Sequence, residues 1–410
     1  MAPFLCLTAF SQVADDGKGA ISGQKPPEEI LVQLRPLQID GRKALQAKDV
    51  ERLDRVIEQM TSVLGSWAGI PETTTIYFPP TDLSPLDMKH VREEWFAELN
   101  RGFGSLPWYR NPEADPEKMR AGLREVALPL DALSRTALIY PERKVQLVDH
   151  ITEGAHWLLR CQHPSGVFPF PVGPARNPRD KVGHIVANAV KERPDLVVNG
   201  WISDDRGDGG LQFDTGLCGK SLLSAWKVTG EARYLEGARR AGEWAMTCPL
   251  VSNWNYNAFS AGLLGQLYGA TQEKQFLDAA IEKLSIGVLP GQMQGGRWFD
   301  GHNACAVYHN ILLREMLEVL RVLPKDHSFR PRLADAVRRG LDQCANETLE
   351  NGYSGTWSEV FALGIFELGE NRLWRDAMNI CVNAQGRNGA PRIGMSAVTI
   401  LELLETPGNK

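Results

Sequence analysis

The chain has 410 residues, 43% hydrophobic and 23% charged, which is an ordinary composition for a globular protein with a large core. Its formal net charge is −5 and no run of lysine and arginine stands out. This balance argues against nucleic acid or a membrane surface as the main partner. The seven cysteines are scattered with no CxxC or metal spacing, so we expect buried, reduced thiols.

Residues 1–22 form a signal-like or disordered segment. Residues 4–10 are apolar, and Ala14 is a small residue of the kind found at signal-peptide cleavage sites. The positively charged region that begins a secretory signal is missing. Both interpretations stay open. We expect a periplasmic or secreted protein, with a cytoplasmic one as the alternative.

Residues 23–138 are expected to form an N-terminal helical region. Apolar residues recur at helical spacing over residues 28–64, and residues 73–80 form a short β-like piece. Residues 115–138 and 143–161 predict a pair of helices. Residues 174–210 form the longest irregular stretch, with a possible short helix at 185–191, and such stretches are often functional.

A small-residue helix pattern recurs four times in the second half of the chain. Its alanines are Ala238, Ala280, Ala336 and Ala377, at steps of 42, 56 and 41 residues. Each copy is preceded by a second helix and followed by a glycine turn, and a helix-pair period of this length indicates a ring or solenoid of helical hairpins. We therefore predict an all-α fold, an (α/α) toroid, with residues 139–410 as a single main domain.

A glutamine–glycine–aromatic turn occurs at Gln162…Gly166-Val167-Phe168 and again at Gln292…Gly296-Arg297-Trp298. Such turns occur in α/α rings. A glycine that ends a helix under an aromatic cover explains most of them equally well.

Four segments place polar and aromatic residues at the start of an apolar helix. In a ring of hairpins the starts of the inner helices share one face, so these residues would be neighbours. They are Asp214, the Asn253/Asn255/Asn257 group, His302 with His309, and Tyr353.

The two histidines His302 and His309 are seven residues apart, so in one helix they share a face. A single histidine in an apolar helix is more often a packed core residue. Two on one face, beside Asp300, Asn303 and Tyr308, make a catalytic role as well supported as a structural one.

Asparagine, histidine and tyrosine together suit β-elimination at a uronic acid. Hydrogen bonds or a cation neutralise the C6 carboxylate, which makes the C5 proton acidic. A base then removes that proton, and a tyrosine or histidine donates one to the departing O4. The reaction needs no metal and no organic cofactor.

With its ring repeats, the sequence resembles the polysaccharide lyases built on an α/α toroid, the group of alginate and glucuronan lyases. The resemblance rests on residues 140–405, on NWNYN (253–257), GHNACAVYHN (301–310) and NGYSGTW (351–357). It implies an anionic polysaccharide substrate. It also implies catalytic roles for Asn255 or Asn257, His309 or His302, and Tyr308 or Tyr353.

Six further residues are expected to bind the substrate: Asp214, Trp201, Trp254, Arg206, Arg297 and Trp298. The alternatives are a glycoside hydrolase on the same ring, including an unsaturated-uronyl hydrolase, a sugar epimerase, and a non-enzymatic solenoid. A hydrolase would use carboxylates, for which the candidates are Asp204, Asp205, Asp208, Asp214 and Asp300.

Overall fold

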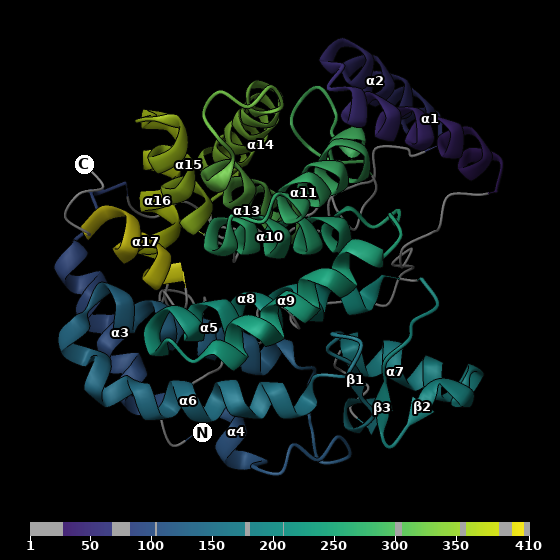
Figure 1. The fold of residues 1–410 in the computed structure, drawn as a ribbon. Helices are drawn as coiled ribbons and strands as arrows, with labels where there is room; N and C mark the ends of the chain where they lie inside the picture. The colour runs from purple at the N-terminus through teal and green to yellow at the C-terminus, as the bar shows by residue number, and fades with distance from the viewer. Residues whose placement is uncertain are drawn as a thin grey trace. The chain divides into compact units, whose positions relative to one another are not determined.

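The structure, a computed structural model, describes residues 28–67, 83–102, 105–176, 181–207, 209–299, 306–352, 358–384 and 396–405. In these ranges it is almost entirely helical (Figure 1). The predictions for residues 1–27 and 73–80 lie outside the described residues. No described helix is long and apolar enough to cross a membrane.

The chain divides into two compact units. The first contains Asp87–Pro249 and Pro391–Lys410, and the second contains Leu250–Ala390 together with Ala14–Leu86. The region 23–138 contributes to both, α1 and α2 to the second unit and α3 to α5 to the first.

The helices of the first unit are α3 (Met88–Gly102), α4 (Pro107–Arg110), α5 (Arg124–Ile139), α6 (Lys144–Cys161), α7 (Lys181–Glu192), α8 (Gly210–Thr229), α9 (Ala232–Thr247) and α17 (Ser396–Glu405). The 3₁₀ turns η3 (Pro141–Arg143), η4 (Gly173–Arg176) and η5 (Pro194–Leu196) and the strands β1 (Phe170–Pro171), β2 (Val197–Val198) and β3 (Trp201–Ile202) complete it. α5 packs against α8, and α6 and α9 pack behind them.

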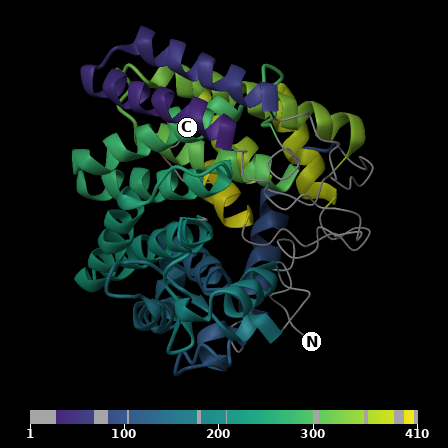
Figure 2. The ribbon, with the colours of Figure 1, turned by 90° about the vertical axis from the view of Figure 1, so that its right-hand side faces the viewer.

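The second unit contains α1 (Glu28–Ala47), α2 (Val50–Trp67), α10 (Trp254–Thr271), α11 (Lys274–Gly287), η6 (Leu289–Gly291), α13 (Ala306–Val322), α14 (Arg330–Asn351), α15 (Glu359–Leu368) and α16 (Arg372–Ala384). α13 packs against both α10 and α15. The α1–α2 hairpin lies along α11 (Figure 2), where Arg42 is paired with Glu282 at 2.8 Å.

Burial differs between the two helices of the α8–α9 hairpin. In α8, 17 of 20 residues are buried, whereas in its hairpin partner α9 only 6 of 16 are buried. A helix that is buried all round lies inside, and a helix with one buried face lies outside. The inner helices are α5, α8, α10, α13 and α15, and their outer partners are α6, α9, α11, α14 and α16.

This order of hairpins is that of the predicted all-α (α/α) toroid class. The repeated alanines Ala238, Ala280, Ala336 and Ala377 lie in four of the outer helices and are at most 2% exposed. The expected reduced state also holds for the described cysteines, which are free thiols.

The glutamine turns are one structural device used twice. Gln162 Nε2 donates to the carbonyls of Gly166 and Gly237, at 2.9 and 2.8 Å, and Arg240 donates to Gln162 Oε1. Gln292 Nε2 donates to the carbonyls of Gly296 and Ala336, at 3.1 and 2.8 Å, and Arg339 donates to Gln292 Oε1. Each turn thereby joins one outer helix to the next one, from α6 to α9 and from α11 to α14.

Two predicted boundaries are wrong. The helix expected from residue 115 begins at Arg124, because the Asn111 side chain bonds both the carbonyl and the amide of Asp115 in a turn instead. The stretch 174–210 is more ordered than expected, since α7 spans Lys181–Glu192 and a small sheet follows it.

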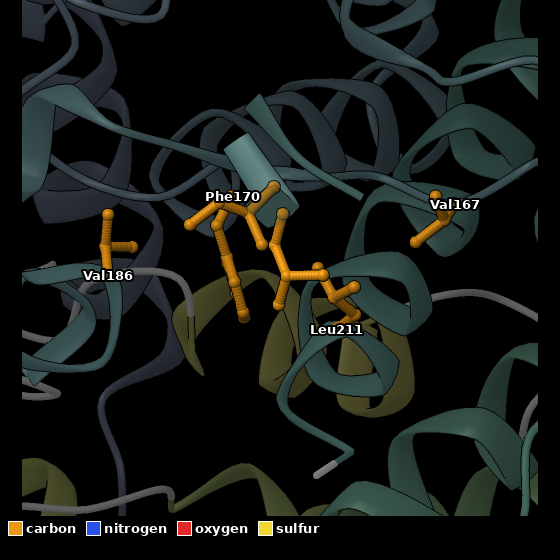
Figure 3. Close-up of a cluster of buried hydrophobic side chains, with 6 residues drawn as sticks. Val167, Phe170, Val186 and Leu211 are labelled. Atoms are coloured by element: carbon orange, nitrogen blue, oxygen red, sulfur yellow. The ribbon is translucent and has the colours of Figure 1, made fainter. Parts of the chain in front are cut away.

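That sheet has the strand order β1–β3–β2, all antiparallel. Asn199 and Gly200 join β2 to β3 with φ of 51° and 80°, as the two central residues of a tight hairpin turn require. Its core, shown in Figure 3, lies over the start of α8 and consists of Val167, Phe170, Val186, Leu196, Ile202 and Leu211.

Candidate functional site

The inner helices α10 and α13 run parallel in a fixed register. A methyl group at Gly262 would overlap Glu315, and methyl groups at Gly265 and Gly269 would come within 3.0 and 2.9 Å of Val319 and Val322. The two residues of each pair are 53, 54 and 53 positions apart in the sequence. The contact therefore runs in the same direction along both helices. The three glycines let the two backbones approach closely.

This register places Asn255 opposite Tyr308. Asn255 lies seven residues before Gly262, and Tyr308 lies seven residues before Glu315. Residues seven apart share a helix face, so each side chain lies on the side of its helix that faces the other helix. The offset of 53 places both at one level, in the first turns of α10 and α13. Asn255 is fully buried and Tyr308 is partly exposed.

The neighbouring Asn257 is occupied by backbone bonds. Its Nδ2 donates to the carbonyls of Val251 and Gly287 at 2.8 and 2.7 Å, and its Oδ1 accepts from the Val251 amide at 3.1 Å. It thus ties the approach to α10 to the end of α11.

His309 lies between α13 and α14 and is fully buried. Its ring meets the Trp298 ring edge to face at 5.2 Å, and its Nε2 is 3.4 Å from where a Cβ of Gly340 would lie. Neither ring nitrogen has a hydrogen-bond partner. Burial lowers the pKa of His309 well below its usual value and the Arg297 cation lowers it further, while the Gly296 backbone acts in the opposite direction. His309 is therefore neutral.

Asp214 lies in the first unit, in the first turn of α8. It is fully buried, and its carboxylate accepts from the Arg124 guanidinium at 2.5 Å and from the Arg124 amide at 3.3 Å. It thereby satisfies one of the free amides at the start of α5. Further along, Ser221 and Ser224 bond residues 127 and 131, so α5 and α8 are also parallel.

The predicted substrate-binding residues have different surroundings. In the second unit, Trp298 is fully buried, and its Nε1 donates to the Val288 carbonyl at 3.0 Å. Trp254 is 4% exposed. Arg297 is 7% exposed and forms an ion pair with Glu347. In the first unit, Trp201 is partly exposed in β3, and the exposed Arg206 is paired with Asp195 at 2.6 Å. His302 and Tyr353 lie outside the described residues.

Some of the buried polar atoms without a partner lie at the starts of inner helices. These include Asn253 Oδ1 before α10, both nitrogens of His309 in α13, and Ser358 Oγ before α15. Stable cores leave few such atoms, and functional sites are one place where they persist. Sequence inspection missed Ser358, although its place directly before an apolar helix was the available signal.

The aspartates of the loop before α8 serve the backbone. Asp204 accepts from the Arg206 amide at 2.7 Å, and Asp205 accepts from the amides of Gly207 and Leu211 at 3.1 and 3.0 Å. Asp208 and Asp300 lie outside the described residues. Within the described ranges, no group of three or more His, Cys, Asp or Glu side chains is arranged to hold a metal ion.

No protein-family model and no curated protein matches the sequence. Solved structures with a similar fold include a polysaccharide lyase, at 13% identity and a TM-score of 0.46 over 77% of this chain and 96% of that one. A family 88 glycosyl hydrolase from Bacteroides vulgatus has 10% identity and a TM-score of 0.47 over 77% and 97%. A family 127 β-arabinofuranosidase has 13% identity and a TM-score of 0.44 over 80% and 60%. At these values the three structures carry no information on this chain's substrate.

Proposed function

We propose that this protein is a carbohydrate-active enzyme that cleaves a uronic-acid-containing polysaccharide by β-elimination. The observation that carries the proposal is the placement of Asn255 and Tyr308 at one level on facing sides of α10 and α13. A neutral amide can neutralise the substrate carboxylate and a phenol can move a proton, which are two of the tasks that the elimination requires.

The Asn255 amide donates a hydrogen bond to the substrate carboxylate, which lowers the cost of negative charge developing at C5. Tyr308, whose side chain is partly exposed, transfers a proton between the sugar and the site. Asn255 is favoured over Asn257 because it lies on the face of α10 that packs against α13, at the level of Tyr308. The Asn257 amide instead holds the loop before α10 through three bonds to the backbone.

His309 supports the site from behind rather than touching the sugar, because its ring lies against Gly340 of α14 and meets the Trp298 ring. His302 and Tyr353 remain candidates for the base and the acid that complete the reaction. The two described aspartates of the loop before α8 and the ion-paired Asp214 serve the fold, which favours elimination over hydrolysis.

The test uses a panel of uronate polymers and the ultraviolet absorbance of the unsaturated uronate that only elimination creates. We expect Tyr308→Phe to lower kcat by about 10²-fold or more, the usual scale for losing an acid–base group. Tyr268→Phe, at the other end of α10, is the matched control and should leave kcat unchanged. Cleavage without new absorbance would replace elimination with hydrolysis, and a fully active Tyr308→Phe would remove Tyr308 from the site.

A further inference from the structure

One face of α14 forms a wall against the start of α13. Gly340, Cys344 and Glu347 are spaced four and three residues apart, so they share that face. Gly340 leaves room for the His309 ring, and Cys344 Sγ donates to Asn310 Oδ1 at 3.5 Å. Glu347, two turns beyond Gly340, accepts from Arg297.

The Arg297–Glu347 pair is nearly enclosed, with side chains 9% and 17% exposed. Arg297 Nε donates to Glu347 Oε1 at 2.6 Å, and a second guanidinium nitrogen donates to Oε2, so the bond is bidentate. Gln343 also donates to Oε1, at 2.7 Å. Such a fork fixes orientation as well as distance. It therefore fixes the turn that carries Trp298, the next residue, against α14.

Trp298 in turn covers His309. Arg297 is the charged group that acts on the imidazole. The other charged residues on the neighbouring elements are Arg339 and Glu347 of α14 and Glu315 further along α13. A cation beside a buried imidazole opposes a second positive charge there.

We propose that the Arg297–Glu347 ion pair is a positioning device for His309, because it holds the turn that carries Trp298 against the imidazole ring. Glu347 and Gln343 are then positioning residues of the site at the start of α13. The role of this ion pair in catalysis rests on the proposed function. The positions of Arg297, Trp298 and His309 do not depend on that function.

Nitrogen NMR of the histidine rings in the full chain tests the charge, with His309→Gln to assign the signal. The wild-type ring should stay neutral between about pH 8 and pH 5, where an ordinary imidazole changes charge. Arg297→Gln leaves the Glu347 carboxylate without its cation, so the ring should take up its proton at a higher pH than in the wild type. Arg297→Lys, which keeps the cation, should behave like the wild type, and the exposed Arg338→Gln is the control.

A wild-type ring that charges in this range, or an Arg297→Gln ring that takes up its proton at no higher pH than the wild type, would overturn the proposal. If Arg297→Gln does not fold, the double variant Arg297→Gln/Glu347→Gln is measured instead, because it leaves no unpaired charge buried. In that variant the amides of Met293 and Gly296, which bond within the turn, should exchange hydrogen faster than in the wild type, and unchanged exchange counts against positioning. Neither readout needs turnover, so a chain that cleaves no uronate polymer would refute the proposed function alone.

Discussion

At the scale of single residues, the surroundings of a side chain decide what it can do. Asn255 and Asn257 are two residues apart and chemically identical, yet Asn257 is held by three backbone bonds. Asn255 lies on the face of α10 that packs against α13. Tyr308 and His309 differ in the same way, because adjacent helix residues point about 100° apart, one toward α10 and the other toward α14.

The buried His309 should make the protein sensitive to acid. Above the ordinary pKa of about 6.5 the ring is neutral in both the folded and the unfolded chain, so it has no effect on the pH dependence. As the pH falls below that value, the unfolded chain binds a proton and the folded chain does not, because burial lowers the folded-state pKa. The free energy of unfolding then falls by up to about 1.4 kcal/mol per pH unit.

Chemical unfolding at several pH values measures this slope. In His309→Gln the slope below pH 6.5 should be shallower by that amount, whereas the exposed His163→Gln should behave as the wild type. Equal slopes in His309→Gln and the wild type would mean that His309 is already protonated in the folded chain.

At the scale of elements, the two glutamine turns explain how consecutive outer helices are joined. In each turn, the glutamine Nε2 donates to a carbonyl of its own turn and to a carbonyl of the next outer helix. An arginine of that helix donates to the glutamine Oε1. The glycines Gly166 and Gly296 both have φ of 96°, and a side chain there would overlap the carbonyl of Arg240 or Arg339. The sequence resemblance of the turns therefore reflects a shared packing requirement.

Gln292→Ala should lower the free energy of unfolding by about 2 kcal/mol, because it leaves the buried carbonyls of Gly296 and Ala336 without their donor. The neighbouring Gln294 is exposed, so Gln294→Ala should change stability little. Urea unfolding of both variants checks the difference, and two equal midpoints would show that the turn does not need its glutamine.

At the scale of the whole molecule, three arginines from both units are held in ion pairs within the fold. Each described arginine that was expected to bind the substrate, and the one at the start of α5, has a carboxylate partner: Arg297 with Glu347, Arg206 with Asp195 and Arg124 with Asp214. An anionic sugar would then be held by neutral donors such as Asn255 rather than by free cations.

This neutrality predicts a weak effect of salt on substrate binding. Raising the ionic strength from about 0.1 M to about 1 M shortens the Debye length from about 10 Å to about 3 Å. We expect the KM for a uronate polymer to change by less than about threefold, because few unscreened charges contribute to binding. A rise of tenfold or more, measured by the ultraviolet assay, would show that free cations bind the polymer.

The amino-acid sequence by itself determined the helical hairpins and which helices are outer ones, because periodicity and small residues are local properties of the chain. It also indicated the inner-helix starts as the place for chemistry. It could not choose between Asn255 and Asn257, or separate Tyr308 from His309. Those choices depend on which neighbour each side chain meets, and the close approach at Gly262, Gly265 and Gly269 that sets the register of α10 against α13 exists only in the folded protein.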